Sequence, residues 1–172
     1  MPYKIDERVV HPTYGVGRIV GLVAKRFEAE ERQFYEVAIE RSTVWVPVDD
    51  SRNGNGNGLR PLTPKADLNK YRRLLQSSPK PLTQDPRQRK VDLQDRMKIG
   101  TFQAMCETVR DITARGWYKP LSEADTALLR KAREGLCQEW AVSAEISVVQ
   151  ATAEVNALLQ AGRQAHQAQP AA

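Results

Sequence analysis

The hydrophobic pattern changes once, near Thr63, and this change limits the fold more than any other feature of the sequence. Before Thr63, short runs rich in Val, Ile and aromatic residues stand between turn residues, as in Arg18–Phe27. After Thr63, apolar residues recur about every 3.6 positions, as in Lys65–Gln76. The first pattern is typical of strands and the second of helices. The sequence therefore predicts an α+β chain, in which a β module precedes a helical domain.

The β module is expected to span residues 1–62. Its five candidate strands are Glu7–Val10, Arg18–Phe27, Gln33–Ile39, Thr43–Val48 and Leu59–Leu62. Short strands separated by turn residues favour a small, strongly bent antiparallel sheet or an SH3-like barrel. The repeat NGNGNG, Asn53–Gly58, exceeds a two-residue hairpin turn and predicts a flexible loop before the last strand.

The helical domain is expected to be compact, all-helical and to span residues 63–165. Pro86–Ile99 reads as one helix, with Asp85 as its N-cap and Gly100 just past its end. Two more helix starts carry capping boxes, formed by Ser122 with Asp125 and by Ser147 with Gln150. The tail at 166–172 has no apolar period, and we expect it to be disordered.

The stretch HPTYGVGRIVGL contains three glycines, Gly15, Gly17 and Gly21, and raises the question of a phosphate-binding loop. A dinucleotide-binding fingerprint needs G-x-G-x-x-G between a strand and a helix, whereas here a strand follows. A Walker loop needs Gly-Lys followed by Ser or Thr, which is absent from the sequence. We interpret the stretch as a tight turn leading into a strand, with glycines that supply positive φ.

The sequence offers no catalytic or metal-binding constellation. Cys106 and Cys137 each lie among apolar residues at helical spacing, which favours buried, reduced thiols. His11 and His166 are far from both cysteines and from each other, and no metal-ligand spacing occurs. No nucleophile stands near either histidine in the sequence. We therefore expect a binding protein without a cofactor or metal, and not an enzyme.

The positive charge is concentrated in one segment. Residues 1–62 carry nine basic and nine acidic side chains, and residues 99–172 carry seven and eight. Residues 63–98 carry ten basic and four acidic side chains, so the net charge of +5 originates there. A local basic block is typical of a site for nucleic acid, although Lys and Arg also occur on ordinary solvated helices.

Within this block, the segment DPRQRKVDLQDR (Asp85–Arg96) is the best candidate for nucleic-acid binding. Arg87, Arg89 and Lys90 cluster at a helix start, where positive charge opposes the helix macrodipole. A residue choice that weakens its own helix favours another role, such as phosphate binding. The alternative is that these side chains pair with acidic neighbours, namely Asp85, Asp92 and Asp95.

Several segments together resemble the CarD/CdnL family. The runs DERVVHPTYGVGRIVGL, FYEVAI, TVWVPVD and GLRPL are similar to the N-terminal module of that family. ETVRDITAR and LSEADTALLRKAREGLCQEW are similar to its helical domain. The resemblance covers about residues 3 to 160, and the order and spacing of the motifs agree across both domains.

The resemblance implies a bacterial transcription regulator without enzymatic activity or cofactor. Its N-terminal module would be a Tudor-like RNA polymerase interaction domain that docks on the polymerase β subunit. Its helical domain would contact upstream promoter DNA and stabilise the open complex. We accordingly expect a monomeric, cytoplasmic, nucleoid-associated protein, and no run of the sequence is apolar enough for a membrane span.

The resemblance also assigns site residues. Lys25, Phe27 and Trp45 would form the polymerase-binding surface. Trp45 alternates with Val44 and Val46 and should therefore face away from them, although it could instead pack inside the small barrel. An exposed Trp beside a sheet is a good interface anchor.

On the DNA side, the resemblance assigns Pro86, Arg87, Arg89 and Lys90. Pro86 stands where well-known members have a Trp that wedges at the upstream edge of the DNA bubble. Proline is apolar but lacks the stacking area of an indole. We expect this chain to stabilise the bubble weakly or differently from those members.

Two other interpretations remain open at the level of sequence. The basic block alone would suit a non-specific architectural DNA-binding protein that has no polymerase partner, whose affinity would fall steeply with salt. A protein-binding scaffold would use the same block only as a solvated surface.

Overall fold

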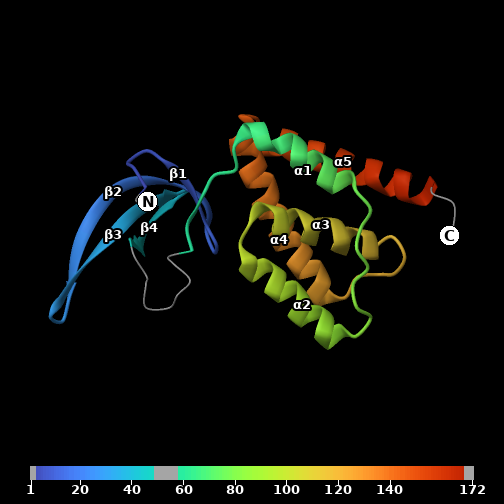
Figure 1. Ribbon diagram of the computed structural model, residues 1–172, viewed down its shortest axis with the longest axis horizontal. Helices are drawn as coiled ribbons and strands as arrows, with labels where there is room; N and C mark the ends of the chain where they lie inside the picture. Colours follow the sequence, from blue (N-terminus) through green and yellow to red (C-terminus); the bar gives the residue numbers. More distant parts are fainter. Residues whose placement is uncertain (1–2, 49–57, 169–172) are drawn as a thin grey trace. The chain divides into compact units, whose positions relative to one another are not determined.

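The computed structural model describes residues 3–48 and 58–168. The chain divides into two compact units, Met1–Leu62 and Thr63–Ala172. Within the described residues, the first unit contains a five-stranded antiparallel sheet and the second contains five α-helices (Figure 1). The α+β architecture predicted from the change in pattern near Thr63 is confirmed.

The sheet has the strand order β4-β3-β2-β1-β5, and all its neighbouring strands are antiparallel. Its described strands are β1 (Arg8–His11), β2 (Gly15–Phe27), β3 (Glu30–Ile39), β4 (Ser42–Pro47) and β5 (Arg60–Pro61). Its core consists of Val9, Ile19, Tyr35, Val37 and Val46. The predicted loop Asn53–Gly58 lies outside the described residues, apart from Gly58.

The three glycines of the HPTYGVGRIVGL stretch have different roles, and our interpretation of them as turn residues is correct only for Gly15. Gly15 has φ of 79° and begins β2 opposite His11. Gly17 and Gly21 lie inside β2. A Cβ atom on Gly17 would lie 2.7 Å from Cγ1 of Val37, so Gly17 permits a close approach of β2 and β3.

The helical unit consists of α1 (Leu68–Gln76), α2 (Pro86–Ile99), α3 (Phe102–Arg115), α4 (Glu123–Ala144) and α5 (Val148–Ala168), with a short 3-10 turn, η2 (Lys65–Asp67), before α1. The predicted caps are confirmed. Asp85 accepts a hydrogen bond from Arg87 N at 3.1 Å, and Gly100 ends α2 with φ of 75°. Ser147 and Gln150 exchange bonds of 3.0 Å, and the Ser122 hydroxyl accepts from the backbone N–H of Asp125.

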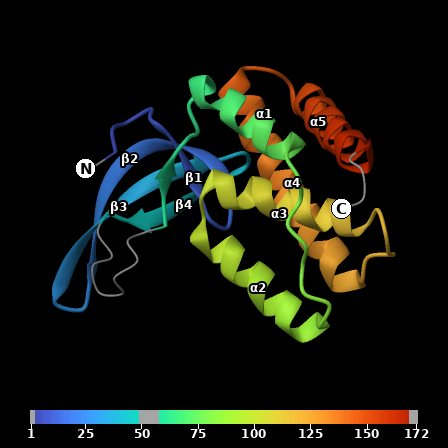
Figure 2. The same cartoon turned by 45° about the vertical axis from the view of Figure 1, so that its right-hand side comes forward.

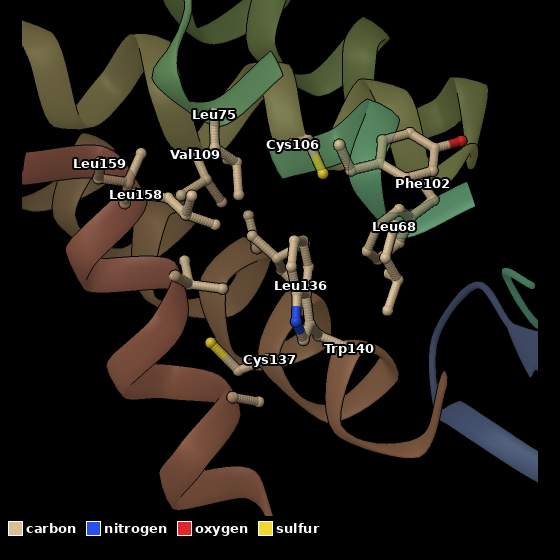
Figure 3. Packing of buried hydrophobic residues seen from close by; sticks show 14 of the residues in the cluster. Leu68, Leu75, Phe102, Cys106, Val109, Leu136, Cys137, Trp140, Leu158 and Leu159 are labelled. Atoms are coloured by element: carbon tan, nitrogen blue, oxygen red, sulfur yellow. The ribbon is translucent and has the colours of Figure 1, made fainter. Parts of the chain in front are cut away.

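The core of the helical unit surrounds Leu136 and Trp140 of α4, which are fully buried (Figure 3). Figure 2 shows α1 and α5 side by side on one side of this core, with α2 and α3 on another. Cys106 and Cys137 are buried and are not joined in a disulfide, as predicted. No described helix is long and apolar enough to cross a membrane.

The end of α5 differs from the sequence prediction. Residues 166–168 are helical, although we expected a disordered tail to start at 166. The reason is tertiary: the ring of His166 lies 6.0 Å from that of Trp117, and Arg163 lies 5.8 Å from the Trp117 ring. These contacts join the last turns of α5 to the loop after α3. They form although this part of α5 has no apolar period.

Candidate functional site

A bulge in β2 decides which side chains lie on the outer face of the sheet. Ile19 pairs with Val37, which is fully buried, and the register then shifts so that Gly21 pairs with Glu36. Because directly opposite residues share a face, β2 changes face between Ile19 and Gly21. Strict alternation from Ile19 would have placed Lys25 on the core side.

The shifted register brings the three predicted polymerase-binding residues onto one face. Lys25 pairs with Arg32, and Phe27 with Glu30, on the face that Glu36 shares with its β4 partner Trp45. Val44 and Val46 lie on the opposite face with the core, as the alternation predicted. We call the outer surface formed by Lys25, Phe27, Phe34, Glu36 and Trp45 the Trp45 face.

Trp45 is exposed and yet held by its neighbours. Its side chain is 53% exposed. Lys25 Nζ lies 2.9 Å from the centroid of the indole ring, a cation–π contact, and the indole N–H donates to Glu36 Oε1 at 3.2 Å. Phe27, 54% exposed, contacts Phe34 edge to face with ring centroids 5.8 Å apart.

Gly21 makes room for the carboxylate that holds Trp45. A Cβ atom at Gly21 would lie 2.7 Å from Glu36 Oε2. Any larger residue would therefore force the Glu36 carboxylate to shift. Sequence reasoning missed both Glu36 and Phe34. Their alternation with Tyr35 and Val37 was the available signal, but it did not identify which face is outside.

The start of α2 presents a basic surface. Pro86 occupies the first turn, and Pro86, Arg87 and Lys90 are all exposed. Arg87 and Lys90 are three residues apart and therefore lie on one side of the helix. Of the acidic neighbours considered above, Asp85 caps the helix and Asp92 accepts from Gln88 Nε2 at 2.8 Å.

Arg89 does not belong to this surface, and its assignment to DNA binding is not compatible with its burial. Its exposed fraction is 4%, and its Nε donates to Asp125 Oδ2 at 3.0 Å. Its Nη1 donates to the carbonyls of Thr83 and Gln84 at 3.1 and 3.2 Å. Arg89 thus fixes the segment before α2 to α4, and its guanidinium is not presented to a ligand.

A second buried carboxylate also binds the segment before α2. Asp111 of α3 is 1% exposed and accepts from Arg96 Nη1 at 2.6 Å, Arg110 Nε at 2.9 Å and the backbone N–H of Lys80 at 2.9 Å. Part of the basic surplus of residues 63–98 therefore neutralises buried acids. Arg87 and Lys90 remain in solvent.

Among the described residues, no group of three or more His, Cys, Asp or Glu side chains is arranged to hold a metal ion. Three pockets of the helical unit are lined mainly by apolar and basic side chains. The Trp45 face exposes aromatic side chains and the start of α2 exposes basic ones, and such surfaces are suited to contacts with macromolecules.

Comparison with known proteins agrees with both units. Residues 3–62 match the family model of the CarD-like/TRCF RID domain, and residues 70–156 match that of the CarD C-terminal domain. The chain is also 27% identical over 140 residues to the "Putative transcription factor YdeB" of Bacillus subtilis, an alignment that covers 81% of this chain and 91% of the relative. The C-terminal model alone covers half of the chain. The chain therefore belongs to the CarD-like family, a family of non-enzymatic transcription factors with an RNA polymerase interaction domain.

Proposed function

We propose that this protein regulates transcription by connecting RNA polymerase to promoter DNA. In this proposal the Trp45 face binds the polymerase β subunit, and the start of α2 binds upstream promoter DNA through Arg87 and Lys90. The two contacts together change the lifetime of the open complex. Membership of the family supports a polymerase partner in general, and the geometry of the two surfaces supports the assignment of residues.

The observation that carries the polymerase contact is the exposed, immobilised indole of Trp45. Tryptophan is enriched among the few residues that carry most of the binding energy of protein interfaces. Lys25 and Glu36 hold the ring in place before any partner arrives. Binding then costs less conformational entropy, because the ring does not have to be ordered in the complex.

Exposure and position support the DNA contact of Arg87 and Lys90. Both are exposed at a helix start, where positive charge weakens the helix and a phosphate is favoured. Pro86 is also exposed there and offers only a small apolar surface. We therefore expect this chain to bind promoter DNA with little wedging of the bubble. Arg89 has no part in this contact.

Binding of the full-length protein to purified β subunit tests the first contact. Trp45→Ala should weaken binding by roughly 30-fold, as expected for an indole at the centre of an interface. Tyr14→Ala is the matched control, because Tyr14 is also 53% exposed and lies outside the Trp45 face. Equal binding of both variants and the wild type would remove the polymerase contact from this face.

The salt dependence of DNA binding tests the second contact. The Arg87→Ala/Lys90→Ala double variant should lower the slope of log affinity against log salt by about 2, one for each lost phosphate contact. The Lys70→Ala/Arg73→Ala double variant of α1 also removes two exposed positive charges and serves as the control. If both double variants show the same slope, the DNA contact does not lie at the start of α2.

A further inference from the structure

A cavity of about 190 Å³ lies in the helical unit, beside the segment that precedes α2. Its walls come from residues 79–84, the C-terminal end of α3, the following loop and the last turns of α5. The apolar part of its lining includes two prolines and a tyrosine that is 65% exposed, namely Pro79, Pro81 and Tyr118. We call it the Tyr118 pocket.

The hydrogen bonds around the Tyr118 pocket fix its walls. The backbone N–H of Lys80 donates to Asp111, which Arg96 and Arg110 also hold. On the other side, Lys119 Nζ donates to Gln84 Oε1 at 3.2 Å, which joins the loop after α3 to the segment before α2. The pocket therefore exists before a ligand binds, and ligand binding need not order its backbone.

The charges around the Tyr118 pocket favour an anion. Lys80, Arg115 and Lys119 line it, and both lysines are exposed. Its one acidic lining residue, Asp111, is buried and receives three donors. The exposed charges at the rim of the pocket are thus positive, and the rest of its lining is mostly apolar. A ligand that matches this pocket has a flat apolar part and a negatively charged part.

His166 forms part of the wall of the Tyr118 pocket. Its Nδ1 is buried with no hydrogen-bond partner among the described residues, so this nitrogen does not face the open pocket and is not part of the binding site.

We propose that the Tyr118 pocket holds one unpaired nucleotide of a DNA strand. The base lies against Tyr118 and the two prolines, and the neighbouring phosphates lie at Lys80 and Lys119. Stacking of bases on aromatic side chains within a basic groove is the general mode of single-strand recognition. The pocket ends at Gln84, next to the helix start that carries Arg87 and Lys90. The inference rests on the proposed function in one respect: duplex DNA bound at Arg87 and Lys90 would bring the strand to the pocket.

The test compares the full-length protein on two DNA probes, a blunt duplex and the same duplex extended by a short single-stranded tail. The wild type should bind the tailed probe roughly tenfold more tightly, the contribution expected of one stacked base. Tyr118→Ala should abolish this preference without changing affinity for the blunt duplex. Tyr118→Phe should retain the preference, because it keeps the aromatic face. Tyr14→Ala is the control for loss of an exposed tyrosine.

The outcomes separate this inference from the proposed function. The Arg87→Ala/Lys90→Ala variant should weaken binding to both probes and leave the ratio of affinities intact. Equal affinity of the wild type for the two probes, or an unchanged ratio in Tyr118→Ala, would overturn the inference while duplex binding stands. A free mononucleotide should compete for the pocket and reduce the preference of the wild type for the tailed probe, whereas an acidic peptide should not. Competition by the acidic peptide alone would mean that the pocket takes a peptide, and the assignment to a DNA strand would be wrong.

Discussion

At the scale of single residues, a substitution at Gly21 tests whether the position of the Trp45 indole affects binding to the β subunit. Gly21→Ala places a methyl group where Glu36 Oε2 now lies, 2.7 Å away. The Glu36 carboxylate must then shift, which should weaken or break its bond from the Trp45 indole, and binding to the β subunit should fall by up to about fivefold, the effect of one hydrogen bond. Gly135→Ala is the control, because its new methyl group meets only the Met105 side chain at 3.4 Å. Unchanged binding of Gly21→Ala would show that Glu36 does not position the indole.

His11 gives the β module a dependence on pH. Its Nδ1 accepts hydrogen bonds from the backbone N–H groups of Thr13 and Tyr14, at 3.0 and 3.2 Å. Burial lowers the pKa of His11 below its usual value of 6.5, since the charged ring is poorly solvated. A lowered pKa means that the native state favours neutral His11. The resulting stability is full above pH 6.5 and is lost as pH falls through the folded-state pKa.

Urea unfolding at pH 7.5 and 5.5 measures this contribution. His11→Asn keeps an acceptor for the turn and removes the titration. The variant should therefore lose less stability than the wild type between the two pH values. Equal losses would mean that His11 does not contribute to the pH dependence.

The sequence predicts the orientation of single residues only where a local pattern fixes it. Trp45 was placed opposite Val44 and Val46, because alternation in a short regular strand is reliable. The orientation of Lys25 and Phe27 was not predictable in this way, because the bulge between Ile19 and Gly21 reverses the alternation. Gly21 at the bulge is a weak signal, because a glycine inside a strand can mark either a bulge or a close backbone approach, and only pairing with β3 determines the shift.

At the scale of elements, α2 combines a structural side with an exposed basic side. Arg89→Ala would leave Asp125 buried without its main partner, so the free energy of unfolding should fall by about 3–5 kcal/mol. Arg87→Ala removes a solvent-exposed charge and should change it by less than about 0.5 kcal/mol. Thermal or urea unfolding of the two variants measures the difference. Similar stabilities would contradict the structural role of Arg89.

The helix boundaries and the role of Arg89 differ in how well the sequence predicts them. The N-cap of α2 at Asp85 follows from side-chain chemistry within two residues, so the start of the helix was predictable. The burial of Arg89 depends on Asp125, which is 36 residues away. In the sequence, three neighbouring basic residues look equivalent, and only the packing of α2 against α4 separates Arg89 from Arg87 and Lys90.

At the scale of the whole molecule, we propose that one unit binds polymerase and the other binds DNA. The change of pattern near Thr63 revealed the two units, because strand and helix periods are properties of the local sequence. The family resemblance named Lys25, Phe27 and Trp45 of the Trp45 face but not Phe34 and Glu36, which the sheet register adds. The Tyr118 pocket was not visible in the sequence, since it is assembled from segments that are distant in the chain. A variant in one unit should therefore leave the partner of the other unit bound.

The most direct test is the lifetime of the open complex formed by polymerase on a promoter in the presence of the full-length protein. We expect Trp45→Ala to lose both polymerase binding and the effect on lifetime. Arg87→Ala/Lys90→Ala should remain bound to polymerase and lose only the effect on lifetime, while Tyr14→Ala should behave as the wild type. If Trp45→Ala changes the lifetime as the wild type does, the Trp45 face is not the polymerase contact and the central claim is wrong.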